Sequence, residues 1–196
     1  MWEERYSAEE YAYGKQANDF LVQQVGRLPK GRVLCLAEGE GRNAVFLAQQ
    51  GFEVVAVDSS TAGMKKAQDL AKESGVSIET VVADLANFTI APDKFDAVVS
   101  IFCHLPVELR QKVHQQVVNS LKPGGIFLLE AYTPDQLKFK SGGPPVAELT
   151  MQLKDLLEET RGLDVIFSDE LEREVFEGLY HTGLGSVVQL ISRKTE

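Results

Sequence analysis

Short apolar runs alternate along the chain with segments whose apolar residues recur at helical spacing. Runs rich in β-branched or aromatic residues predict buried parallel strands over 32–37, 53–57, 78–82, 95–101 and 125–130. The segments between them predict helices over 44–50, 61–74 and 106–121, which end at Gly51, at Gly75 and before Lys122-Pro123-Gly124-Gly125. Strands that alternate with helices predict right-handed βαβ units, and hence a parallel sheet covered on both faces.

The C-terminal part of the chain departs from this alternation. Its pattern predicts a helix over 146–160 and strands over 170–176 and 186–192, with the Gly-rich stretch 177–185 between the two strands. A link this short can form an antiparallel hairpin, whereas a parallel crossover takes about a dozen residues or more. We therefore predict an α/β fold, a Rossmann-like three-layer sandwich with a mostly parallel seven-stranded sheet and an antiparallel last strand.

Composition narrows the class of protein. The chain has 196 residues, 44% apolar and 25% charged, which fits a single soluble domain over 1–196 and excludes a disordered chain. A net charge of −9 without a Lys/Arg cluster argues against nucleic acid and anionic membranes and favours a small-molecule partner. Cys35 and Cys103 lie in apolar runs, so we expect no disulfide and a cytoplasmic location. The sequence leaves open whether the protein is a monomer or a dimer.

Candidate ligand-binding residues follow the first three predicted strands, where open α/β sheets bind their ligands. Gly39 and Gly41 lie in the loop after the first strand and allow a tight turn and close backbone approach. Asp58 ends the second strand, where a carboxylate can accept both hydroxyls of a ribose; a helix N-cap is the alternative role. Asp84 ends the third strand, where it could accept the amine of an adenine while Leu85 supplies backbone groups.

Taken in order, these features resemble the class I S-adenosylmethionine (SAM)-dependent methyltransferases. The resemblance also includes the Lys-Pro-Gly-Gly turn and the terminal antiparallel hairpin, and it covers nearly the whole chain. Gly41-Arg42-Asn43 and the residues that follow are similar to the small branch that includes the tellurite-resistance and thiopurine methyltransferases. The segments 2–6 and 11–14 are similar to the arm that such enzymes fold over SAM, so residues 1–28 are expected to form an arm and helix that cover the cofactor site.

This resemblance implies an enzyme that transfers a methyl group from SAM to a small molecule, mainly by positioning, with no metal site. One departure concerns the usual acid of the first strand, which is Cys35 here, and Glu38 is a candidate to face the methionine ammonium in its place; a solvated loop glutamate is the alternative. The expected cofactor contacts are Tyr13, Glu38, Gly39, Gly41, Asn43, Asp58, Ser59, Asp84, Leu85, Ile101 and Phe102.

Two histidines are candidate catalytic residues. His104 follows the fourth strand at the ligand-binding edge, where its alternative role is packing or capping under the cofactor. His181 lies on the terminal hairpin at the same edge and is expected, with Tyr180, to line the acceptor pocket; its alternative role is to satisfy backbone groups of the turn. In the tellurite-resistance branch an Arg follows this histidine, whereas Thr182 follows here, which counts against an oxyanion acceptor. His114 is expected to be an ordinary helix residue.

Two other functions remain open at this stage. Residues 39–44 fit the looser dinucleotide fingerprint, so an NAD-dependent oxidoreductase is one alternative. The reversed last strand, Asp84-Leu85 and the lack of a separate substrate domain argue against it. A SAM-binding domain without catalysis is the other, supported by Cys35 alone. The sequence does not identify the acceptor, although the loop predicted over 141–145 suggests a flexible lid over a small molecule.

Overall fold

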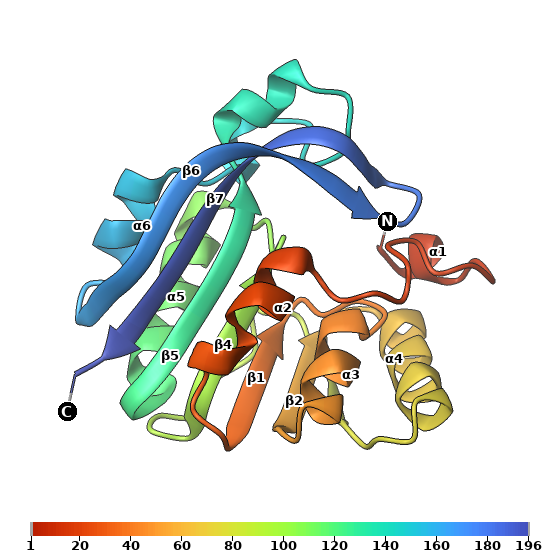
Figure 1. Cartoon of the computed structure of the whole chain (residues 1–196), viewed down its shortest axis with the longest axis horizontal. Helices are drawn as coiled ribbons and strands as arrows, with labels where there is room; N and C mark the ends of the chain where they lie inside the picture. Colours follow the sequence, from red (N-terminus) through yellow and green to blue (C-terminus); the bar gives the residue numbers. More distant parts are fainter. Residues whose placement is uncertain (1, 196) are drawn as a thin grey trace.

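The computed structural model describes residues 2–195, whose strands form one twisted sheet in the order β3-β2-β1-β4-β5-β7-β6 (Figure 1). The first five strands run parallel, and β7 lies antiparallel between β5 and β6. The strands are β1 (Arg32–Leu36), β2 (Glu53–Asp58), β3 (Glu79–Val82), β4 (Phe95–Ile101), β5 (Leu121–Tyr132), β6 (Leu163–Glu177) and β7 (His181–Lys194). The predicted fold class is confirmed.

Helices cover both faces of the sheet, because its strands carry apolar side chains on both sides. On one face Val33 and Cys35 pack with α2, α3 and α4; on the other Leu34 and Leu36 pack with α5 and α6 (Figure 1). The helices are α1 (Trp2–Tyr6), α2 (Asp19–Gln24), α3 (Arg42–Gln49), α4 (Thr61–Glu73), α5 (Val107–Ser120) and α6 (Leu153–Glu159), with 3-10 turns η1 (Val25–Arg27), η2 (Pro134–Lys138) and η3 (Ala147–Leu149). None of these helices within residues 2–195 has the length and apolar character to cross a membrane.

Two predicted strands differ from the expected pattern. β3 is an edge strand with partly exposed residues rather than a buried one, and Val82 at its end is 52% exposed. β5 begins earlier than predicted, at Leu121, which pairs with Phe95. The Lys-Pro-Gly-Gly segment is an irregularity within this pairing, because the next paired residues are Ala97 and Ile126.

The predicted nine-residue link of the C-terminal hairpin was wrong. Glu177 pairs with His181, so only residues 178–180 form the turn, and both strands are longer than predicted. Gly183 and Gly185 belong to β7, where a Cβ on Gly185 would come within 3.2 Å of the Tyr132 ring. Gly185 is therefore a small residue that lets η2 and β5 pack against the strand.

The predicted helix over 146–160 was also wrong in its first half. The chain makes the turn η3, extends through Thr150 and Met151, and becomes helical only at Leu153. The Met151 N–H donates to the carbonyl of Tyr132 at 2.9 Å, and the Met151 side chain is buried. Pairing with the end of β5 thus takes precedence over local helix propensity.

His114 has a larger structural role than its sequence context indicates. Its Nδ1 lies 2.7 Å from Oε2 of Glu159, which also accepts hydrogen bonds from the Arg110 guanidinium. All three side chains are buried, and they join α5 to α6 beneath the sheet.

Gly41, which the sequence predicts to contact the cofactor, has a packing role between α3 and α4 in the structure. It has a φ of 89° at the start of α3, and a Cβ added there would lie 2.5 Å from Cβ of Ala67. Gly51 has a similar φ of 85° at the end of the same helix, with no atom within 4 Å of its added Cβ.

Gly41→Ala should lower the free energy of unfolding by about 2–5 kcal/mol, since left-handed alanine costs about 1–2 kcal/mol and overpacking about 1–3 kcal/mol. Gly51→Ala, which adds the same methyl group in open space, should cost only about 1–2 kcal/mol. Urea unfolding of both variants measures the difference. Equal losses would mean that the contact with Ala67 relaxes without cost.

Candidate active site

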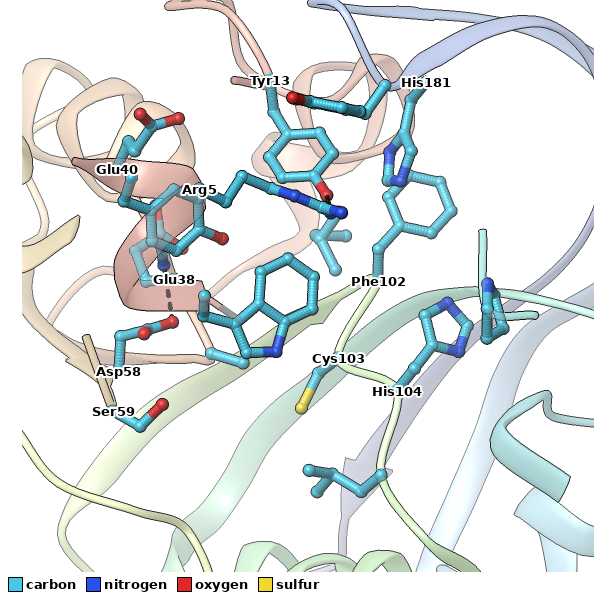
Figure 2. A pocket seen from close by; sticks show the side chains of 18 of the residues that line it. Arg5, Tyr13, Glu38, Glu40, Asp58, Ser59, Phe102, Cys103, His104 and His181 are labelled. Carbon is cyan, nitrogen blue, oxygen red and sulfur yellow. Dashed lines mark hydrogen bonds between the residues drawn. The ribbon is translucent and has the colours of Figure 1, made fainter. Parts of the chain in front are cut away.

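The carboxyl ends of β1, β2, β3 and β4 open into one cavity of about 480 Å³, which we call the strand-end pocket (Figure 2). The N-terminal arm, the 178–180 turn and the loop 142–145 surround it. Apart from Gly41, every predicted site residue lines it: Tyr13, Glu38, Gly39, Asn43, Asp58, Ser59, Asp84, Leu85, Ile101, Phe102, His104 and His181.

The floor of the pocket contains strained backbone. Ala37 and Phe102, which follow β1 and β4, have φ values of 47° and 51°. Non-glycine residues in this left-handed region cost about 1–3 kcal/mol each and cluster at ligand-binding sites. The Phe102 N–H donates to the carbonyl of Glu130 at 2.8 Å, which helps to hold this conformation. The strain therefore lies where the adjacent central strands turn towards the cavity.

Asp58 is held by backbone donors on both sides. Its Oδ2 accepts from the Gly39 N–H at 2.9 Å and its Oδ1 from the Ser60 N–H at 2.8 Å. Burial raises the pKa of Asp58, while these hydrogen bonds act in the opposite direction. Ser60, not Asp58, caps α4, because its Oγ accepts from the Gly63 N–H. Asp58 therefore orients the first loop and keeps acceptor capacity towards the pocket.

Glu38 is a buried carboxylate without a cationic partner among residues 2–195. Its Oε1 accepts from the Ala44 N–H at 2.7 Å. Burial raises its pKa to about 7, although this hydrogen bond and the nearby Arg42 charge lower it. Arg42 itself pairs with Glu177 at 2.6 Å. Cys35, in contrast, lies in the core beneath α3 and does not line the pocket.

The other predicted residues of the cofactor side occupy the wall of the pocket. Asp84 is exposed, and its Oδ1 accepts from the Ala86 N–H at 2.9 Å, while Leu85 is buried beside it. The side-chain oxygen of Asn43 accepts from the Asn18 N–H at 2.9 Å. Asn43 thus connects α3 to the start of α2 as well as facing the cavity.

The N-terminal arm contributes residues that sequence reasoning did not single out. The carboxylate of Glu3 accepts from Ser60 Oγ at 2.6 Å, which fixes α1 at the start of α4. This places Arg5 across the pocket, where its Nη1 donates to the Tyr13 hydroxyl at 2.7 Å (Figure 2). The segment Trp2–Tyr6 has no spacing that marks Arg5, and its contact with the Tyr180 ring joins parts of the chain that are far apart in the sequence.

His181 lies in an aromatic environment on the hairpin side. Its ring centroid is 4.5 Å from that of Tyr13 and 4.9 Å from that of Phe102. Its Nδ1 is 3.4 Å from Oε2 of Glu177, the carboxylate that also binds Arg42. Burial lowers the pKa of His181, against the opposing effect of Glu177, so the imidazole is neutral at pH 7.

His104 interacts with the backbone through both ring nitrogens. Its Nδ1 lies 2.8 Å from the Leu149 carbonyl, so this nitrogen carries the proton and donates. The Tyr132 N–H lies 3.5 Å from its Nε2. Burial lowers the pKa of His104 to about 4. These contacts tie the last residue of η3 to the ends of β4 and β5, and they fit the packing role better than proton transfer.

Comparisons with known proteins found a similar domain and similar folds. Residues 33–125 match the family model described as a methyltransferase domain. A curated relative, 2-heptyl-1-hydroxyquinolin-4(1H)-one methyltransferase from Mycobacteroides abscessus, is 31% identical over 122 residues, which cover 60% of this chain and 54% of that protein. The chain spans about half the length of the curated relatives that it matches first.

Solved structures share the fold over nearly the whole chain. TehB from Haemophilus influenzae superposes with a TM-score of 0.75 at 18% identity, covering 99% of this chain and 66% of that one. A SAM-dependent methyltransferase from Methanosarcina mazei superposes with a TM-score of 0.71 at 16% identity, covering 92% and 99%. The chain therefore has the fold of SAM-dependent methyltransferases of known structure, and residues 33–125 match a methyltransferase domain. This match favours a methyltransferase over the NAD-dependent oxidoreductase.

Solved structures with this fold include SAM-dependent methyltransferases, one of them with bound S-adenosylhomocysteine, and the strand-end pocket here fits such a cofactor. The cavity volume lies within the range of small-molecule and cofactor sites. Glu38 offers a buried carboxylate that lacks a cation, which suits an ammonium group. Asp58 and Asp84 place acceptors at the ends of the next two strands.

Glu38→Gln should stabilise the ligand-free domain above pH 7. A carboxyl whose pKa rises from 4.5 to about 7 on folding costs stability as pH rises between these values, by on the order of 3 kcal/mol above pH 7. Below about pH 4.5 both states bind the proton, so variant and wild type should unfold alike. Denaturant unfolding at pH 4 and pH 8 measures this, with the exposed Glu158→Gln as control. A pH-independent difference would contradict the assignment.

Proposed function

We propose that this protein transfers a methyl group from SAM to a small-molecule acceptor, mainly by holding the two in line inside the strand-end pocket. The observation that carries the proposal is the division of the pocket into two sides. The cofactor side consists of Glu38, Asp58 and Asp84 at the ends of β1 to β3, and the acceptor side of Phe102, Tyr180, His181 and the loop 142–145.

On the cofactor side, each strand end has one task. Glu38 binds the methionine ammonium, Asp58 accepts the ribose hydroxyls beside Ser59, and Asp84 and Leu85 bind the adenine. The wall of this side is completed by Tyr13, Gly39, Asn43 and Ile101, and Phe102 faces both this side and the acceptor side. The first-loop motif and the TehB fold similarity support a place in the tellurite-resistance and thiopurine branch. In this arrangement residues 1–196 act as one domain, and residues 1–28 cover the cofactor.

The cofactor supplies an electrophilic methyl group, so the chain itself needs little covalent chemistry. Positioning of two reactants is worth roughly 7–11 kcal/mol in favourable cases. Where the acceptor carries a proton, neutral His181 accepts it, and Glu177 orients the imidazole from the other side. The arm and the 178–180 turn exclude water, since Leu179 N–H donates to the Ala12 carbonyl at 2.9 Å above the pocket.

The acceptor side is suited to a small and partly apolar molecule. Phe102, Leu105, Pro144, Pro145 and Leu149 give it an apolar wall. The M. abscessus relative is named for a heptyl-substituted hydroxyquinolinone, a small aromatic compound with an alkyl chain, which supports a small-molecule acceptor here.

The proposal is tested by binding and turnover. SAM should bind in calorimetry and NAD should not, and Asp58→Asn should weaken SAM about 10- to 150-fold, the value of a hydrogen bond to a charged group. Asp164→Asn, an exposed carboxylate on β6, is the matched control. A panel of thiols and small acids should yield S-adenosylhomocysteine. NAD binding without SAM binding would overturn the proposal, and SAM binding without turnover on any acceptor would favour the non-catalytic alternative.

His181→Ala should reduce methyl transfer to a protonated acceptor about 100- to 10,000-fold while SAM affinity stays within about twofold. The lowered pKa of His181 predicts that wild-type activity rises with pH below 6.5 and then levels off. The variant should lose this rise. An equal loss of SAM binding would place the hairpin over the cofactor, and unchanged turnover would leave His104 as the remaining candidate.

A further inference from the structure

The strand-end pocket is lined by more carboxylates than cationic side chains. Carboxylates occupy the cofactor side, and Glu40 there is already paired with Lys66 at 2.8 Å. Of the two arginines that line the pocket, Arg42 is neutralised by Glu177. Arg5 is the other.

Arg5 has no carboxylate partner among residues 2–195. Its guanidinium carbon lies 4.5 Å from the ring centroid of Tyr180 and 4.9 Å from that of Trp2. One N–H donates to the Tyr13 hydroxyl, and a guanidinium has five such donors. The rings hold the cation in place and leave donors free for a ligand.

The Arg5 guanidinium points towards the acceptor side. Figure 2 shows the side chain extending away from Glu38 and Glu40 towards Phe102 and His181. Arg5 binds Tyr13, whose ring contacts the His181 ring. Arg5 also stacks on Tyr180, the residue before His181. On the hairpin, Thr182 and not a cationic residue follows His181. The positive charge near the hairpin therefore comes from Arg5 of the N-terminal arm.

We infer that Arg5 binds an anionic group, a carboxylate or phenolate, on an acceptor with an otherwise apolar and planar surface. This rests on the proposed function of the pocket. A guanidinium binds a carboxylate through paired, charge-assisted hydrogen bonds, and the aromatic surroundings strengthen them by excluding water. Phe102, Tyr180 and Pro144 provide flat apolar surface for the rest of the molecule. A cationic amine would meet like charge here.

The test uses benzoate and its neutral isostere benzamide as probes on protein saturated with S-adenosylhomocysteine. Quenching of Trp2, the only tryptophan, and calorimetry both report binding. Benzoate should bind at least tenfold more tightly than benzamide to the wild type. Arg5→Gln should abolish this preference, and Arg5→Lys should keep part of it, because lysine retains the charge without the planar fork. Arg161→Gln, which removes an exposed arginine elsewhere, should bind as the wild type does.

The methionine carboxylate of the cofactor is the competing ligand for Arg5, and a second arm separates the two. If Arg5 binds the cofactor, Arg5→Gln will weaken S-adenosylhomocysteine but not methylthioadenosine, which lacks the amino-acid group, and the inference fails. Equal affinity for benzoate and benzamide in the wild type also overturns it. Failure of S-adenosylhomocysteine to bind the wild type would refute the proposed function itself, so the two failures are distinguishable.

Discussion

The geometry of the site depends on two carboxylates buried together behind it, Glu130 on β5 and Glu177 on β6. Arg173 donates to both oxygens of Glu130, at 2.8 and 2.7 Å, and Arg42 donates to Glu177 at 2.6 Å. The Asn18 amide joins the two carboxylates, at 2.6 and 2.8 Å. Removing one member of such a network would leave an uncompensated buried charge, which costs about 3–5 kcal/mol. The network therefore fixes the hairpin, α2 and α3 in one arrangement.

Within this network, the carboxylate of Glu177 contacts residues from both sides of the pocket. Burial would raise the pKa of Glu177, but hydrogen bonds from His181, Arg42 and Asn18 lower it to about 2. Glu177 thus remains ionised at physiological pH and holds Arg42 beside the first loop and His181 beside the acceptor side. The cofactor loop and the terminal hairpin lie far apart in the sequence, and this shared charge sets their separation.

The site is also where the fold gives up stability. Ala37 and Phe102 have left-handed backbone, and Glu38 is a carboxylate buried without a cation. These features oppose folding of the ligand-free chain, and a zwitterionic ligand would relieve the last of them. Burial of apolar side chains on the two faces of the sheet supplies the folding free energy that offsets this cost.

Local pattern by itself determined the α/β fold, most of the strand and helix positions and the strand-end residues such as Glu38 and Asp58, because hydrophobic period reports burial and parallel strands end at one edge. It misjudged Gly185, since a glycine needed for close packing has the same sequence signal as one needed for a turn. Arg5 and Glu177 emerged only from the tertiary structure. Arg5 stacks on Tyr180, and Glu177 binds Arg42 and Asn18, and no local spacing encodes these contacts between segments that are far apart in the sequence.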